Sequence, residues 1–152
     1  LGLIDADGVE ISDHPHNFVE SATIGGIKGL IHRKGAAPAD RGITVIPGSR
    51  GSLTYVVQPI PAEASLNSVA HGAGRKWARG ECKERLRDRY SVRSLTRTDL
   101  GGLVICEDKD LLFEEAPMAY KNIDNVINEM KDAGLVRVIA TLRPLITYKV
   151  RR

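Results

Sequence analysis

Apolar positions in the first half of the chain fall into short runs that Pro and Gly residues separate. Runs of this length, bounded by turn residues, are typical of strands. The predicted strands lie near residues 29–33, at 43–46 and at 52–57. We therefore expect the first half to consist mainly of sheet.

The second half mixes helical and strand patterns. A charged stretch predicts a helix over about 75–89, and a second helix is predicted over 120–131. In the second helix, apolar residues recur at helical spacing, and Gly134 is placed to end it. Two β-branched apolar runs then predict strands at 136–142 and 145–150. Strands and helices that follow one another without regular alternation favour an α+β fold.

Length and composition are those of a globular protein. The 152 residues suffice for one domain with a substantial core, and 42% hydrophobic with 27% charged residues is ordinary for such a domain. No apolar run approaches the roughly 20 residues of a membrane helix, and the chain does not open with a secretion signal, so we expect a cytoplasmic protein. Cys82 and Cys106 are too few for a disulfide framework and are expected to be reduced thiols.

The net charge of +3 says little by itself, but the charge is unevenly distributed. Residues 75–97 carry nine Lys or Arg and few acids, which predicts a surface that faces phosphate groups. The same stretch also fits a solvated helix whose acids pair with its own bases. Those acids are Glu81, Glu84 and Asp88. Both interpretations stay open at the level of sequence.

The chain opens with Leu and runs directly into the string LGLIDADG, so we expect it to begin inside a longer protein. That string is a near match to the signature of LAGLIDADG homing endonucleases, which need a long set of strands after each copy. Here His16 and Asn17 follow closely, and no second copy is present. Phe18 stands where an intein would place Cys, Ser or Thr. A homing endonuclease is therefore kept only as an alternative.

A succession of short motifs carries more information than any one of them. They are DHPHNFVE (13–20), LIHRKGA (30–36), VIPGSRGS (45–52), AHGAGRKWAR (70–79), EEAPMAYKNID (114–124) and TYK (147–149). In this order they resemble the RtcB family of RNA-splicing ligases over nearly the whole chain. The resemblance implies that residues 1–152 are the carboxy-terminal part of a single ligase domain, without its upstream metal-binding part. PGSRG and HGAGRKWARGECK resemble the branch coupled to peptide release factor H.

The resemblance also implies a reaction. Family members use GTP and Mn²⁺ to guanylate a histidine, activate an RNA end that bears a 3′-phosphate or 2′,3′-cyclic phosphate, and join it to a 5′-hydroxyl end. His71 matches the guanylated histidine, and a neutral imidazole nitrogen is nucleophilic enough to attack phosphorus. The small residues Gly72, Ala73 and Gly74 are expected to let backbone N–H groups approach the phosphates of the nucleotide.

Phosphate and RNA contacts are expected from basic residues of two motifs. In LIHRKGA these are Arg33 and Lys34, whose charge offsets phosphate repulsion. In AHGAGRKWAR they are Arg75 and Arg79, whose planar guanidinium groups suit a phosphoryl group. Trp77, between them, is expected in the core rather than stacked on a base.

One metal ligand is expected within the chain. His16 matches the family's His-Asn ligand for Mn²⁺, and Asn17 is expected to orient a phosphate of the nucleotide. His14 and His32 remain alternatives as ligands. The resemblance implies that an aspartate, a cysteine and two more histidines, the other ligands, lie upstream of Leu1.

Guanine recognition is expected from residues far apart in sequence. Tyr120 matches the family's residue that covers the purine ring, and Lys149 matches the one that donates to the guanine oxygen. Ser49 and Thr54 match polar positions that touch the nucleotide, and Arg50 replaces the more usual Met. A noncatalytic RNA-binding module is the main alternative function, because most metal ligands are missing from the chain.

Overall fold

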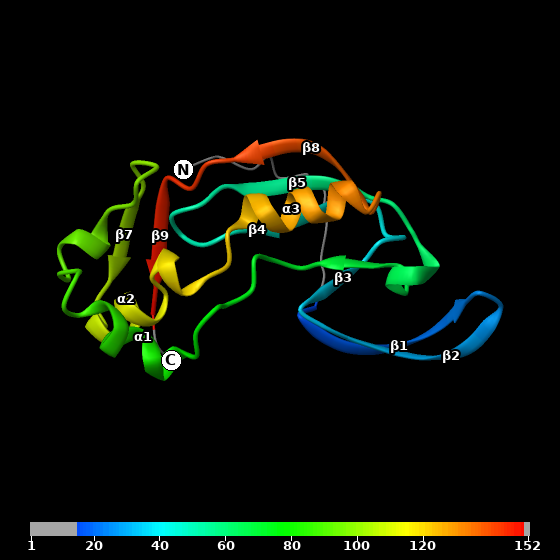
Figure 1. Ribbon diagram of the computed structural model, residues 1–152, viewed down its shortest axis with the longest axis horizontal. Helices are drawn as coiled ribbons and strands as arrows, with labels where there is room; N and C mark the ends of the chain where they lie inside the picture. Colours follow the sequence, from blue (N-terminus) through cyan, green and yellow to red (C-terminus); the bar gives the residue numbers. More distant parts are fainter. Residues whose placement is uncertain (1–14, 151–152) are drawn as a thin grey trace, which may run out of the picture.

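A computed structural model of the protein describes residues 15–150. The LGLIDADG string and His14 lie outside the described residues. Short strands and helices are mixed along the chain, which confirms the predicted α+β class (Figure 1). Within the described range, no helix is both long and apolar enough to cross a membrane. Cys82 and Cys106 are free thiols.

A β-hairpin projects from one end of the molecule (Figure 1). Strand β1 (Asn17–Ile24) pairs antiparallel with β2 (Ile27–Lys34) along its whole length. The turn between them uses Gly25 and Gly26, whose φ angles of 57° and 79° lie in the left-handed region that glycine adopts readily. β2 contains the strand predicted near 29–33, whereas β1 was absent from the predicted strands.

Three strands and one helix form the first core. β4 (Thr44–Pro47), β5 (Thr54–Pro59) and β8 (Val136–Leu142) make an antiparallel sheet in the order β4-β5-β8. Each of these strands overlaps a predicted one. Helix α3 (Ile123–Asp132) runs along this sheet (Figure 1). Its buried residues are Ile123, Ile127 and Met130.

Two very short strands lie beside this core. β3 (Ala36–Pro38) pairs antiparallel with β6 (Ser68–Ala70). β3 begins just after the hairpin, and His71 follows β6 directly. This pairing therefore brings the end of the hairpin next to the glycine-rich motif.

A second core lies at the opposite end from the hairpin (Figure 1). It contains α1 (Arg79–Leu86), α2 (Lys109–Glu114), β7 (Leu103–Cys106) and β9 (Ile146–Lys149). β9 confirms the last predicted strand, and it pairs parallel with β7. The buried residues of this core are Leu86, Leu95, Val104, Leu112, Phe113 and Ala116. Three 3₁₀ turns complete the connections, at Glu63–Ser65, Ser94–Thr96 and Pro117–Ala119.

Both predicted helices begin later than the pattern indicates. The first begins at Arg79 rather than near Arg75, because Arg75 forms a β-bridge with Tyr120 instead. The backbone N–H of Lys76 also donates to the neighbouring segment at 2.8 Å, so this stretch has no freedom to become helical. The second begins after Asn122, whose side chain accepts from the backbone at 2.7 Å and caps the helix.

Charged residues of α1 pair with nearby acids. Arg85 pairs with Glu81 one turn earlier at 3.2 Å, and Lys83 pairs with Asp110 of α2 at 2.6 Å. Trp77 is partly buried against the second core, and the Arg85 guanidinium lies over its ring. These contacts favour the solvated-helix interpretation of the basic stretch and agree with the predicted core placement of Trp77.

Candidate functional site

A depression of about 320 Å³ lies where the loops before β1, after β4 and after β6 meet. Five of the six sequence motifs contribute residues to its lining. The lining residues that carry chemistry or fix the loops include His16, Gly35, His71, Arg79 and Tyr120. The fold thus gathers motifs that are far apart in the chain into one place.

Gly35 ties the two histidines of the depression together. Its N–H donates to the backbone oxygen of His16 at 2.9 Å, and its carbonyl accepts from the N–H of His71 at 3.1 Å. Gly35 has a φ of 67°, a conformation that favours glycine. As a result, the ring centroids of His16 and His71 lie 5.7 Å apart, with the rings nearly perpendicular at 74°. His71 is half-buried and His16 is exposed.

The described residues supply only part of a metal site. Among residues 15–150, no group of three or more His, Cys, Asp and Glu side chains is placed to hold a metal ion. His16 offers an imidazole at the depression, but a transition-metal site needs further donors beside it. The alternative ligand His32 does not line the depression, and its Nε2 lies 2.6 Å from the Asn17 side-chain oxygen. With that oxygen occupied, the amide nitrogen is the atom of Asn17 that remains to meet a phosphate.

The loop after His71 is held close to the loop after β4. Ala73 donates its N–H to the Pro47 carbonyl at 3.0 Å, and a Cβ on Gly72 would lie 3.2 Å from that same oxygen. Gly74 has a φ of 73°, and its carbonyl accepts from the N–H of Lys121 at 3.0 Å. A close backbone oxygen therefore favours glycine at position 72 and the φ angle favours it at position 74, and these small residues also leave the depression open beside His71.

Arg75 is occupied by protein partners. Its Nη1 donates to Glu115 at 3.2 Å and to the Tyr120 hydroxyl at 3.0 Å, while its Nη2 donates to Cys82 at 3.2 Å and to the Glu114 carbonyl at 2.6 Å. Its Nε donates to a backbone carbonyl at 3.2 Å. A guanidinium has five N–H donors, and all five are used. Arg75 lines the depression, but a phosphate contact by its guanidinium would have to replace one of these five hydrogen bonds.

Glu115 is the functional candidate that the sequence analysis did not identify. Its Oε2 accepts from the Tyr120 hydroxyl at 2.6 Å and from the Lys149 ammonium at 3.5 Å. Its Oε1 pairs with Arg75 at 3.2 Å and with Arg79 at 3.5 Å. We refer to these five residues as the Glu115 cluster. It brings together Tyr120 and Lys149, the two expected base-recognition residues, and joins them to the glycine-rich loop.

Electrostatics keep the Glu115 cluster in one ionisation state. Burial by itself would raise the pKa of Glu115, but the hydrogen bond from Tyr120 and the charges of Lys149, Arg75 and Arg79 together lower it below its ordinary value. Burial and the hydrogen bond to Glu115 raise the pKa of Tyr120. The cluster therefore holds an ionised carboxylate and a neutral phenol, and its three cations exceed its one anion.

The remaining basic candidates separate into a buried and an exposed residue. Arg33 is only 4% exposed, pairs with Glu20 and donates to Ser68 at 2.9 Å, with Phe18 against its guanidinium. This placement differs from the expected phosphate-facing role and instead fixes the base of the hairpin. Lys34, the next residue, is exposed as expected for a phosphate contact.

The polar residues of the Pro-Gly-Ser loop do not line the depression. Ser49 is buried, and its hydroxyl lies 2.7 Å from that of Ser52, which stabilises the loop. Thr54 begins β5 and is half-buried. Arg50 is buried and donates to the Leu95 and Leu112 carbonyls at 3.2 and 3.0 Å, and burial lowers its pKa. The loop therefore anchors the second core, a role that its motif does not reveal.

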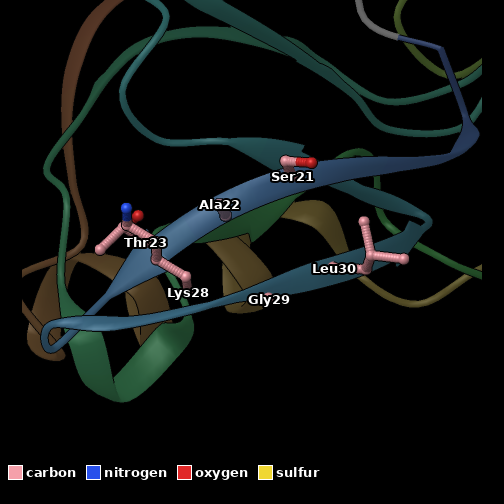
Figure 2. Close-up of a pocket in the computed structure, with 6 residues that line it drawn as sticks. All are labelled: Ser21, Ala22, Thr23, Lys28, Gly29 and Leu30. Carbon is pink, nitrogen blue, oxygen red and sulfur yellow. The ribbon is translucent and has the colours of Figure 1, made fainter.

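A larger depression of about 510 Å³ lies on the hairpin, away from the histidines. Figure 2 shows its lining, which comes from the middle of β1 and β2. Small residues such as Ala22 and Gly29 make it shallow, and Lys28 is the one titratable residue among those that line it. Its lining residues include the hydroxyls of Ser21 and Thr23 but no His, Asp or Glu to activate them, so it offers less chemistry than the smaller depression.

Comparison with known proteins assigns the family. Residues 5–150 match the family model described as tRNA-splicing ligase RtcB. RNA-splicing ligase RtcB2 of Escherichia coli (strain ATCC 25922) is 50% identical over 146 residues, which is 96% of this chain and 38% of that protein. RNA-splicing ligase RtcB of E. coli K12 is 35% identical over 92% of this chain and 32% of its own length. The tRNA-splicing ligase RtcB of Nanoarchaeum equitans is 33% identical over 96% of this chain and 35% of its own.

The chain belongs to the RtcB family of RNA-splicing ligases. The match covers nearly all of it, which confirms the family that the motif order predicted and removes the reason to keep the homing-endonuclease alternative. The chain spans about a third of the length of these relatives, so the activity of the whole protein is a matter of proposal.

Proposed function

We propose that the complete protein is a GTP- and Mn²⁺-dependent RNA ligase that carries GMP on His71. The observation that supports this most directly is the position of His71, half-buried in a glycine-rich loop and 5.7 Å from His16 between ring centroids. Arg79, whose side chain is 68% exposed and makes one ion pair, at 3.5 Å, is the cation best placed to meet a phosphate.

The proposed reaction has three transfers at phosphorus. An imidazole nitrogen of His71 forms a P–N bond to the α-phosphorus of GTP as pyrophosphate leaves. A 2′,3′-cyclic phosphate end would first add water at phosphorus and break its P–O2′ bond, which leaves a 3′-phosphate and a 2′-hydroxyl. An oxygen of the RNA 3′-phosphate then attacks the same α-phosphorus and displaces the imidazole. Finally the 5′-hydroxyl of the second RNA end attacks the activated 3′-phosphate and GMP leaves. When bound, Mn²⁺ would be held by His16 together with donors that the described residues do not supply, and it would provide Lewis-acid charge to the phosphoryl groups.

Tyr120 and Lys149 are proposed to bind the guanine. The Arg75 guanidinium lies 4.9 Å from the centroid of the Tyr120 ring, so it occupies one face and leaves the other for a base. Lys149 uses one of its three donors on Glu115 and retains two. One of these suits the guanine oxygen, whereas adenine presents an amino group there.

The proposed partners are RNA ends, one with a 3′-phosphate or 2′,3′-cyclic phosphate and one with a 5′-hydroxyl. Exposed Lys34 is proposed to contact the RNA backbone. The motifs PGSRG and HGAGRKWARGECK support a functional link to release factor H, as part of cytoplasmic RNA repair or tRNA splicing.

The test is covalent labelling of the complete protein with GTP and Mn²⁺. We expect one GMP adduct per chain, acid-labile and sensitive to hydroxylamine, on the peptide that contains His71. The His71→Ala variant should show no adduct by intact mass, and its melting temperature should match that of the wild type. A full-level adduct in His71→Ala would falsify the assignment. RNA binding without any adduct would support the noncatalytic RNA-binding module instead.

A further inference from the structure

The backbone of Glu115 is rigidly fixed at the end of α2. The helix is capped at its start by Asp108 and anchored in the second core by Leu112 and Phe113, which are 1% and 6% exposed. At its end, the N–H of Glu115 donates to the Leu111 carbonyl at 3.0 Å. A carboxylate at the carboxyl end of a helix faces the negative end of the helix dipole. Helix stability therefore does not explain a glutamate at this position.

The two carboxylate oxygens of Glu115 serve different groups. Oε2 accepts from Tyr120 at 2.6 Å and from Lys149 at 3.5 Å, the two residues proposed to bind the base. Oε1 meets Arg75 and Arg79 at 3.2 and 3.5 Å, the residues that follow the His71 loop. One nearly buried group, with its side chain 11% exposed, therefore touches both halves of the proposed nucleotide site.

Lys149 depends on this carboxylate for a defined position. Its ammonium is carried on a flexible four-carbon stem, and its side chain is 39% exposed. Arg75 and Arg79 share the same carboxylate, so its removal would leave three cations facing one another without an anion between them. Repulsion and chain entropy would then both move the ammonium away from its present place.

We propose that Glu115 is a positioning residue for nucleotide selection, which holds the Lys149 ammonium in the place that favours guanine over adenine. The proposal rests on the function proposed above, because it assigns Glu115 a role in that same site. Glu115 acts through Lys149 and does not itself contact the reacting atoms.

The test compares rates of GMP and AMP adduct formation by the complete protein, with GTP and ATP at equal concentrations below saturation. Glu115→Gln keeps the size of the side chain but removes its charge. We expect the preference for GTP over ATP to fall about tenfold, the order of one lost charged hydrogen bond. A variant that merely destabilised the fold would lower both rates alike, and thermal melting checks for this. Glu107→Gln, an exposed carboxylate on the loop before α2, is the matched control and should leave the ratio unchanged.

A double-variant cycle then asks whether Glu115 acts through Lys149. Lys149→Ala should lower the preference to a similar degree, because it removes the donor itself. The combination of Glu115→Gln with Lys149→Ala should lower it no further than Lys149→Ala does. If Glu115→Gln does not fold, Glu115→Asp retains the charge but is too short to keep the 3.5 Å contact, and it should show the same loss of preference.

The outcomes separate this proposal from the one on which it rests. If the wild type forms an adduct and the GTP preference of Glu115→Gln or Glu115→Asp is unchanged, the role of Glu115 is overturned while the ligase function stands. If the GTP preference of the double variant falls by the product of the two single-variant factors, Glu115 does not act through Lys149, and the proposal is equally overturned. If the wild type forms no adduct at all, the proposed function itself fails, and the role of Glu115 fails with it.

Discussion

Burial divides the arginine and lysine residues of this chain into two kinds with different roles. Arg33 and Arg50 are buried and Arg75 is half-buried, and each of them donates to oxygen atoms of the protein. Lys34 and Arg79 are exposed beside the site. A guanidinium can satisfy several buried acceptors at once, which suits it to hold loops together as well as to bind phosphate. Residue type alone therefore does not identify the residues that contact RNA.

Substitution of the adjacent pair Arg33 and Lys34 tests this division. Arg33→Ala should lower the free energy of unfolding by about 3 kcal/mol, because it breaks a buried ion pair. Lys34→Ala should change it by less than about 0.5 kcal/mol, as is usual for a surface residue. In RNA binding measured against salt concentration, Lys34→Ala should reduce the salt slope by about one.

Denaturant unfolding and RNA titrations on the two variants of the complete protein provide the measurements. In Arg33→Ala, Glu20 keeps its second partner, Arg41. The loss in free energy of unfolding should therefore lie at the lower end of the range for broken buried ion pairs. Unchanged stability of Arg33→Ala together with weakened RNA binding would restore Arg33 as a phosphate contact.

At the scale of elements, the site is assembled by loops that short strands place next to one another. The hairpin ends at Gly35, β3 follows at once, and its partner β6 leads directly into His71. No single helix or strand carries both His16 and His71. Their relative position therefore depends on the two backbone hydrogen bonds of Gly35, at 2.9 and 3.1 Å.

Gly35→Ala should slow guanylation of the complete protein, because a side chain at a φ of 67° is strained and the relaxed backbone would displace His16 from His71. The strain should lower the free energy of unfolding by about 1 to 3 kcal/mol. Gly42→Ala is the matched control, since Gly42 has a φ of 84° and open space around its Cα but lies outside the depression. We expect comparable destabilisation in both variants and slower adduct formation in Gly35→Ala alone. Equal rates for the two variants would show that Gly35 does not set the geometry of the histidines.

At the scale of the whole molecule, the chain presents apolar surfaces at both ends. Leu30 and Ile27 of the hairpin are each 77% exposed, and Ile146 and Tyr148 of β9 are 65% and 69% exposed. Relatives are about three times as long as the segment they share with this chain, and residues 15–150 contain no group of three or more side chains placed to hold a metal ion. We therefore expect the proposed activity to require more than the described residues.

The 152-residue chain on its own should therefore bind Mn²⁺ weakly and form little GMP adduct. Calorimetric titration with Mn²⁺ and intact-mass measurement after incubation with GTP would compare it with the complete protein. In the complete protein, His16→Ala should weaken Mn²⁺ binding, which checks that His16 belongs to the site. Efficient guanylation by a verified 152-residue chain would show that the metal site has been misplaced.

The sequence by itself determined the family and the longer periodic elements. The apolar spacing of α3 could be recognised because one face of this helix is buried, and the β-branched runs of β8 and β9 are typical of strands. The order of the motifs also predicted the family and placed His71 within a loop of small residues. β1 was not predicted, because Glu20 and the small Ala22 interrupt the alternation of apolar residues along this strand.

Only the tertiary structure decided which polar residues face one another. Glu115 meets Arg75 from 40 positions away and Lys149 from 34, and no local pattern indicates such a partner. The late start of α1 has the same origin, since the backbone around Arg75 pairs with the segment at Tyr120 instead of forming helical hydrogen bonds. Hydrogen bonds and ion pairs depend on distance in space, whereas periodicity depends on distance along the chain. The longer periodic elements could therefore be predicted from the sequence, whereas β1, β3, β6, β7, α2 and the Glu115 cluster could not.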